Sequence, residues 1–136
     1  MTFLDTNILL YAISTDVADR AKALRSREIL LQDDLCVSVQ VLQEFYVQAT
    51  RPTRSQPYSH ADATAIIGHW LRFHVVALTV PVMQNALQLK ERYQVSYWDA
   101  AILAAAASAG CTELLSEDLN SGQSYDKIHV TNPFAS

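Results

Sequence analysis

In the segment Thr2-Phe3-Leu4-Asp5-Thr6-Asn7, a short apolar strand ends at Asp5 and a helical turn begins directly afterwards. Four further strand-like runs follow, at residues 35–37, 74–78, 113–116 and 128–131, and helical patterns lie between most of them. This alternation is typical of a parallel sheet that helices cover on both faces. We therefore predict an α/β fold with a five-stranded, mainly parallel sheet sandwiched between helices, in a single domain spanning residues 1–136.

The helices are predicted from apolar periodicity and from the residues at their ends. Ser38, Ser59, Thr79 and Ser96 are suited to cap the first turn of a helix. Gly110 is suited to the left-handed position after the last turn. The predicted helices span residues 7–12, 16–32, 39–49, 59–73, 79–93 and 97–109, and two prolines make residues 51–58 a loop.

The composition indicates a compact globular protein. Half of the 136 residues are hydrophobic, and there are only three glycines and four prolines. No apolar run approaches the ~20 residues of a membrane span, and the N-terminus lacks the pattern of a signal peptide. Cys36 and Cys111 lack metal-ligand spacing, so we expect reduced core thiols in a cytoplasmic protein, with a disulfide as the alternative.

The charge does not favour a protein that coats nucleic acid, because the net charge is −4 and the pI is about 5.4. Any contact with nucleic acid must therefore be local. Basic residues gather at Arg20, Lys22, Arg25 and Arg27, and Arg51 and Arg54 flank the proline-containing loop. A solvated helix face is the ordinary explanation for the first group.

Four acidic residues lie where predicted elements begin, end or border a cleft. Asp5 and Asp118 follow strands, Asp99 opens an alanine-rich helix, and Glu44 lies on a helix between Leu42 and Phe45. Each has an ordinary explanation when taken singly. Asp5 and Asp99 suit helix N-termini, Asp118 suits a turn, and a glutamate beside an apolar stripe is usually solvated.

The joint pattern predicts a divalent-metal site. The carboxyl ends of parallel strands share one edge of the sheet, where α/β proteins bind ligands. Carboxylates gathered there would repel one another by about 4 kcal/mol per pair at 4 Å and an effective dielectric of 20, so protons or cations must neutralise them. Oxygen ligands suit Mg²⁺ or Mn²⁺ rather than Zn²⁺, and the four histidines show no ligand-like grouping with the acids (His60, His69, His74 and His129).

Four segments in this order resemble the PIN-domain ribonucleases, and more narrowly the VapC-type toxins of prokaryotic toxin–antitoxin pairs. They are Leu4–Asn7, Ser38–Phe45, Tyr97–Ile102 and Leu115–Asn120. The resemblance covers nearly the whole chain. It implies a PIN-like fold and a Mg²⁺- or Mn²⁺-dependent endoribonuclease that cleaves single-stranded or loop RNA with a metal-activated water.

The resemblance also assigns roles to residues. It carries the metal-binding and catalytic acids onto Asp5, Glu44, Asp99 and Asp118, and it gives supporting roles to neighbouring polar residues (Thr6, Asn7, Ser116 and Asn120). Family members often have a further acid where this chain has Asn120, so either one or two ions are implied. Glu117 is a spare acid whose side chain should point away from Asp118.

The resemblance further implies a cognate antitoxin that neutralises the toxin, an RNA substrate and a homodimer, with no membrane association. The loop Arg51–Tyr58 and its neighbouring helices are the expected antitoxin platform.

Three alternative functions stay open at this point. A haloacid-dehalogenase-like phosphatase would use Asp5 as a nucleophile, but it expects an acid at Asn7 and a catalytic lysine that does not stand out. A receiver-like signalling module would bind Mg²⁺ without nuclease activity; Lys127 is a late lysine, but the phosphoacceptor is missing. The third is a metal-free binding domain whose acids only cap helices.

Overall fold

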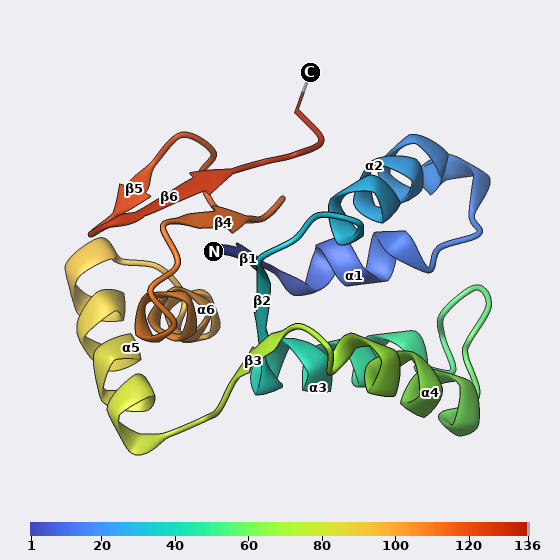
Figure 1. Cartoon of the computed structure of the whole chain (residues 1–136), viewed down its shortest axis with the longest axis horizontal. Coiled ribbons are helices and arrows are strands. Elements are labelled where there is room, and N and C mark those ends of the chain that lie inside the picture. The colour runs from blue at the N-terminus through green and yellow to red at the C-terminus, as the bar shows by residue number, and fades with distance from the viewer. Residues whose placement is uncertain (136) are drawn as a thin grey trace.

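The computed structural model describes residues 1–135. Its elements alternate between strands and helices along the chain, as predicted (Figure 1). In chain order they are β1 (Thr2–Leu4), α1 (Thr6–Ala12), the 3-10 helix η1 (Val17–Asp19), α2 (Arg20–Leu30), β2 (Leu35–Ser38), α3 (Val39–Ala49), α4 (His60–Trp70), β3 (His74–Val76), α5 (Val80–Tyr93), α6 (Tyr97–Ser108), β4 (Glu113–Leu115), β5 (Ser124–Tyr125) and β6 (Ile128–Thr131).

The strands form one mainly parallel sheet in the order β3-β2-β1-β4-β6-β5. All neighbours are parallel except β5 and β6. The five predicted strands are present, and the sheet has a sixth, β5, that the sequence analysis missed. β5 is only two residues long and pairs back onto β6, with Asp126 in the left-handed conformation between them. Two residues are too few to show an alternating pattern.

The order of the strands reverses direction beside β1. From β1 the chain builds the sheet outward through β2 to β3, and it then returns to add β4 on the other side of β1. In α/β proteins ligands bind at such a reversal, outside the carboxyl ends of the two central strands, which here are β1 and β4. The ends of these strands carry Asp5 and Ser116.

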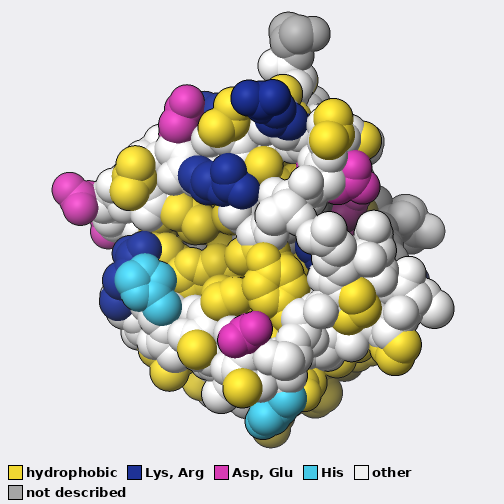
Figure 2. Space-filling model, turned by 90° about the vertical axis from the view of Figure 1, so that its right-hand side faces the viewer, with side chains coloured by type: hydrophobic (Ala, Val, Ile, Leu, Met, Phe, Trp, Pro, Cys, Tyr) yellow, Lys and Arg dark blue, Asp and Glu magenta, His cyan; other side chains and the backbone are white. Residues whose placement is uncertain are grey.

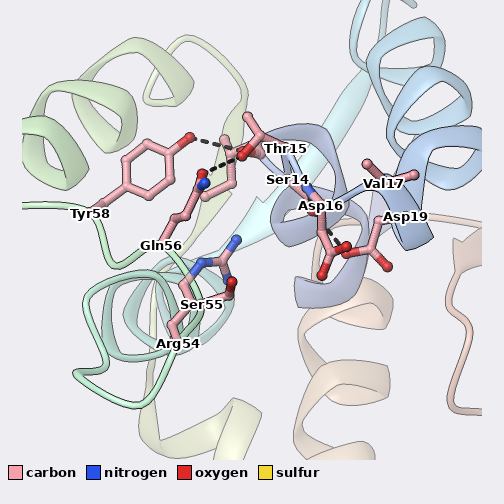
Figure 3. Close-up of a pocket in the computed structure, with 10 residues that line it drawn as sticks. Ser14, Thr15, Asp16, Val17, Asp19, Arg54, Ser55, Gln56 and Tyr58 are labelled. Carbon is pink, nitrogen blue, oxygen red and sulfur yellow. Dashed lines mark hydrogen bonds between the residues drawn. The ribbon is translucent and has the colours of Figure 1, made fainter.

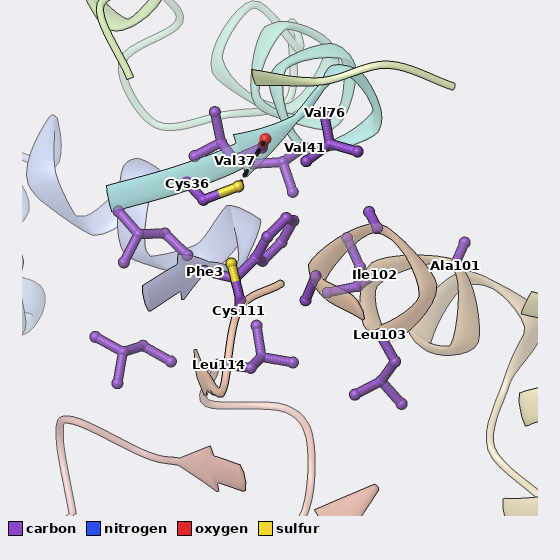
Figure 4. Packing of buried hydrophobic residues seen from close by; sticks show 14 of the residues in the cluster. Phe3, Cys36, Val37, Val41, Val76, Ala101, Ile102, Leu103, Cys111 and Leu114 are labelled. Carbon is purple, nitrogen blue, oxygen red and sulfur yellow. Dashed lines mark hydrogen bonds between the residues drawn. The ribbon is translucent and has the colours of Figure 1, made fainter. Parts of the chain in front are cut away.

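Helices cover both faces of the sheet, with α5 and α6 on one side and α1 to α4 on the other (Figure 1). Helix α6 packs against β2, β3 and β6, and its alanines from Ala100 to Ala106 are buried. Their small side chains allow the helix backbone to lie close to the strands. Figure 4 shows Ile102 and Leu103 of this helix beside Phe3 and Leu114 in the core.

Cys36 and Cys111 lie in this core as free, buried thiols, which confirms that the two residues are not bridged. Among the described residues, no helix is long and apolar enough to cross a membrane.

The predicted capping residues begin four helices. Ser38, Ser59, Thr79 and Ser96 each accept a hydrogen bond from the backbone N–H three residues later. Gly110 follows α6 with a φ of 75°, a conformation that glycine adopts without strain. The predicted helix at residues 16–32 is shorter than expected, because residues 17–19 form η1 and α2 starts at Arg20.

Arg27 closes the C-terminal end of α1. Its Nε donates to the carbonyl of Ala12 at 2.9 Å, and its Nη2 donates to the carbonyl of Ser14 at 3.1 Å. A cation is favourable at a helix C-terminus, where carbonyls lack partners within the helix. We expect Arg27→Met to lower the free energy of unfolding by about 1–2 kcal/mol, as measured by urea denaturation. Arg25→Met removes only an exposed pair with Glu28 at 3.4 Å, so a loss as large as that of Arg27→Met would contradict this explanation.

Candidate metal centre

Four acidic side chains gather at the carboxyl edge of the sheet. Asp5 follows β1 and caps α1, and Asp118 follows β4. Asp99 lies in the first turn of α6 and Glu44 in the middle of α3. The electrostatic influence of Asp118 and Glu44 reaches both Asp5 and Asp99. The fold therefore brings together acids that are up to 113 positions apart in the sequence.

Hydroxyl and amide donors hold three of these carboxylates. Asp5 accepts from the Thr6 N–H at 2.7 Å and from Ser116 Oγ at 2.6 Å. Thr6 Oγ1 donates to Glu44 at 2.7 Å, and Asn7 Nδ2 donates to Asp118 at 3.2 Å. Three of the four predicted supporting residues thus contact an acid directly.

The fourth predicted supporting residue, Asn120, contacts none of the acids by a hydrogen bond. Its Nδ2 donates to Gln123 at 3.1 Å in the loop before β5. Glu117 points away from Asp118, as expected, and contacts Lys22 and Tyr11 instead.

Gln40 belongs to the site, although the sequence analysis did not select it. Its side chain is buried, and its Nε2 donates to Glu44 Oε1 at 2.8 Å and, more weakly, to the carbonyl of Trp98 at 3.4 Å. It therefore orients Glu44 and joins α3 to the start of α6. The available signal was its position four residues before Glu44, which places both side chains on one helix face.

Burial and neighbouring carboxylates raise the pKa values of two acids of the centre. Burial raises the pKa of Asp5 to about 6, and Asp118 and Glu44 add to the rise, whereas the hydrogen bonds from Ser116 and Thr6 oppose it. Burial also raises the pKa of Asp99, again with contributions from Asp118 and Glu44 and against the hydrogen bond from Ser96. The neighbours that raise both pKa values are carboxylates, so a bound cation would relieve the repulsion.

The donor set fits a hard divalent cation. It consists of carboxylate oxygens, and one further oxygen, Asn7 Oδ1, is buried without a hydrogen-bond partner among the described residues. Such oxygens suit Mg²⁺ or Mn²⁺. Within residues 1–135, no three Asp, Glu, His or Cys side chains already stand in a metal-binding arrangement. The carboxylates instead face hydroxyl and amide donors.

One pocket lies away from these acids, at the other end of α1. Its volume is about 470 Å³, and it lies between the segment after α1 and the loop 51–58. Figure 3 shows Gln56 and Tyr58 on one wall, opposite Ser14 to Asp19. Tyr58 donates to the carbonyl of Ile13 at 2.9 Å across this pocket. None of the four acids lines this pocket, so it is separate from the candidate metal centre.

One comparison with known proteins identifies a family. The family described as PIN domain matches residues 2–123. No curated protein sequence matches significantly.

Solved structures share the fold at low sequence identity. A toxin–antitoxin complex from Klebsiella pneumoniae contains a chain with a TM-score of 0.74 and 18% identity, covering 98% of each chain. The DNA-bound VapBC complex from Salmonella typhimurium gives 0.68 and 18%, covering 97% of each. VapC20 from Mycobacterium tuberculosis, described as a sarcin–ricin loop cleaving toxin, gives 0.67 and 18%, covering 87% of this chain and 92% of that one.

Proposed function

Because this chain belongs to the PIN domain family, we propose that it is a Mg²⁺- or Mn²⁺-dependent endoribonuclease and the VapC-type toxin of a toxin–antitoxin pair. The observation that carries the proposal is the convergence of Asp5, Glu44, Asp99 and Asp118 at the carboxyl edge of the sheet. Solved structures with the same fold include a toxin described as cleaving the sarcin–ricin loop, which supports RNA as the substrate.

Asp5, Asp99 and Asp118 would hold the cation, and Glu44 would orient a water or hold a second ion. A bound Mg²⁺ or Mn²⁺ lowers the pKa of a water molecule and offsets negative charge on a phosphodiester. The chain's own contribution is positioning: Ser116 and Thr6 fix Asp5, Gln40 and Thr6 fix Glu44, and Asn7 contacts Asp118. Prepositioned groups of this kind need little rearrangement during the reaction.

A covalent phosphatase mechanism fits the site less well. The phosphatase alternative expects an acid two residues after Asp5, and this chain has Asn7 there, whose Nδ2 donates to Asp118. This arrangement favours hydrolysis by an activated water over the haloacid-dehalogenase alternative.

RNA cleavage by the purified protein tests the proposal directly. A mixed single-stranded RNA pool is incubated with the wild type in Mg²⁺, in Mn²⁺ and in EDTA, with Asp99→Asn alongside to exclude a contaminating nuclease. We expect cleavage that requires the metal and Asp99. No cleavage together with no calorimetric binding of Mn²⁺ would reject the proposal, because the acids would then only cap helices.

The antitoxin would cover the face near the loop Arg51–Tyr58. Figure 2 shows this end of the molecule, where hydrophobic side chains gather in a hollow with Lys and Arg side chains beside it. The pocket beside the loop contains the charged residues Asp16, Asp19 and Arg54. Together with the hydrophobic hollow, they suit a partner segment with both apolar and charged side chains. Related folds have been solved as complexes with antitoxins, and this supports a protein partner here.

An apolar stripe on α5 supports a homodimer. Val80, Met83 and Leu87 are large hydrophobic residues that stay exposed, and their spacing places them on one face of the helix. We expect the double variant Met83→Lys/Leu87→Lys to sediment as a monomer where the wild type sediments as a dimer. Leu24→Lys changes a similarly exposed leucine on α2 and should leave the dimer intact. A wild type that is monomeric at all concentrations tested would contradict the dimer.

The extent and location of the protein complete the proposal. The family match ends at residue 123, yet β6 pairs with β4 inside the sheet. We therefore assign the whole chain, 1–136, to one PIN domain.

The unbridged thiols of Cys36 and Cys111 support a reducing, cytoplasmic location.

A further inference from the structure

Glu117 lies between two residues of the candidate metal centre but faces the opposite way. Its neighbours Ser116 and Asp118 contact Asp5 and Asn7. The Glu117 carboxylate instead receives Lys22 Nζ of α2 at 2.6 Å on one oxygen and Tyr11 Oη of α1 at 2.7 Å on the other. Lys22 also contacts Tyr11 Oη at 3.3 Å, so the three side chains form a closed cluster, here called the Glu117 clamp.

Aromatic rings lie against the lysine of the Glu117 clamp. Tyr11 and Phe134 meet edge to face with centroids 5.1 Å apart, and Lys22 Nζ lies over both rings at 5.0 and 5.7 Å from their centroids. The Glu117 side chain is 25% exposed and the Lys22 side chain 41%. A partly buried ion pair with additional hydrogen bonds is held more firmly than an exposed one.

The other side of the same segment is held by Ser116. Its Oγ accepts the N–H groups of Asp118 at 3.1 Å and Leu119 at 3.4 Å while donating to Asp5. Asp118 itself is exposed, and within residues 1–135 its side chain receives one hydrogen bond, from Asn7 at 3.2 Å. The position of Asp118 therefore depends mainly on the backbone that carries it, which is fastened by Ser116 on one face and by Glu117 on the other.

We propose that Glu117, Lys22 and Tyr11 are positioning residues that fix the segment 116–118 so that Asp118 can bind the divalent cation. This inference rests on the proposed metal-dependent function. Glu117 is then not a spare metal ligand. Its role is to hold in place the segment that carries the metal ligand Asp118. Outer partners that orient metal ligands typically change metal affinity by about 10–100-fold when removed.

Calorimetric titration with Mn²⁺ at pH 7.5 tests the clamp without relying on activity. We expect Lys22→Met to bind Mn²⁺ about 10–100-fold more weakly than the wild type, and Lys22→Arg to restore most of the affinity. Tyr11→Phe keeps the ring and removes only the hydroxyl, so it should weaken binding by a smaller factor. Raising the Mn²⁺ concentration should restore RNA cleavage by Lys22→Met, because its catalytic acids are intact.

The chain offers a matched control in Arg92, which pairs with Asp126 at the same 2.6 Å away from the acids. Arg92→Met should leave the Mn²⁺ affinity within about twofold of the wild type, since it contacts no ligand and no outer partner of one. Equal affinities for Lys22→Met, Arg92→Met and the wild type would overturn the inference while leaving the nuclease proposal standing. A wild type that binds no Mn²⁺ would refute both.

Discussion

Asp5→Asn is expected to abolish metal-dependent RNA cleavage while the protein stays folded. Asp5 is the most buried of the four acids, and Asp118 and Glu44 repel its charge. Replacing its carboxylate with an amide removes a charge that the cation needs. We expect the cleavage rate to fall by at least about 100-fold, the usual effect of removing one electrostatic group from an active site.

The fold should survive because asparagine keeps the helix cap and removes a repelled charge. Its Oδ1 can still accept the N–H of Thr6, which caps α1, and the repulsion from Asp118 and Glu44 disappears with the charge. Cleavage is measured on a fluorescent single-stranded RNA, and folding by circular dichroism. Asp33→Asn is the control, because Asp33 is an exposed acid just before β2, at the opposite edge of the sheet. Undiminished cleavage by Asp5→Asn, or its loss of folding, would contradict the assigned role.

The stability of the metal-free protein should depend on pH through Asp5. Its pKa is about 6 in the folded protein and 3.8 in the unfolded chain, chiefly because burial disfavours the charged form. Between these two values the unfolded chain loses its proton while the folded protein keeps it. The contribution of Asp5 to stability is therefore complete below pH 3.8 and is lost as the pH rises to 6, a change of about 3 kcal/mol.

The Asp5→Asn variant isolates this effect because asparagine does not titrate. In EDTA, the variant should gain up to about 3 kcal/mol in unfolding free energy relative to the wild type as the pH rises from 4 to 7.5. Urea denaturation at several pH values measures the difference. Adding Mn²⁺ at pH 7.5 should reverse the order, since a ligand that binds only the folded wild type stabilises it. If the difference in unfolding free energy between the variant and the wild type does not change with pH, burial does not raise the pKa of Asp5.

Much of the fold was predictable because it depends on short-range patterns. The apolar strand Thr2–Leu4, the caps at Ser38 and Ser96 and the glycine at 110 each act within a few residues. The alternation of strands with helices then indicated a parallel sheet. Strand β5 was not predicted, because a two-residue strand is specified by its partner β6 and not by its own sequence.

The sequence places Asp5, Asp99 and Asp118 at strand ends and a helix start, so these three acids were expected at one edge of a parallel sheet. How they are held, and that Glu44 joins them from the middle of α3, follows from the tertiary structure. The bonds from Gln40 to Glu44 and from Ser116 to Asp5, and the clamp of Lys22 and Tyr11 on Glu117, follow from how α1, α2, α3 and the segment after β4 pack together. A helix cap or a strand depends on residues that are close together in the sequence. A hydrogen bond between residues 95 positions apart forms only when packing has set the distance between their elements.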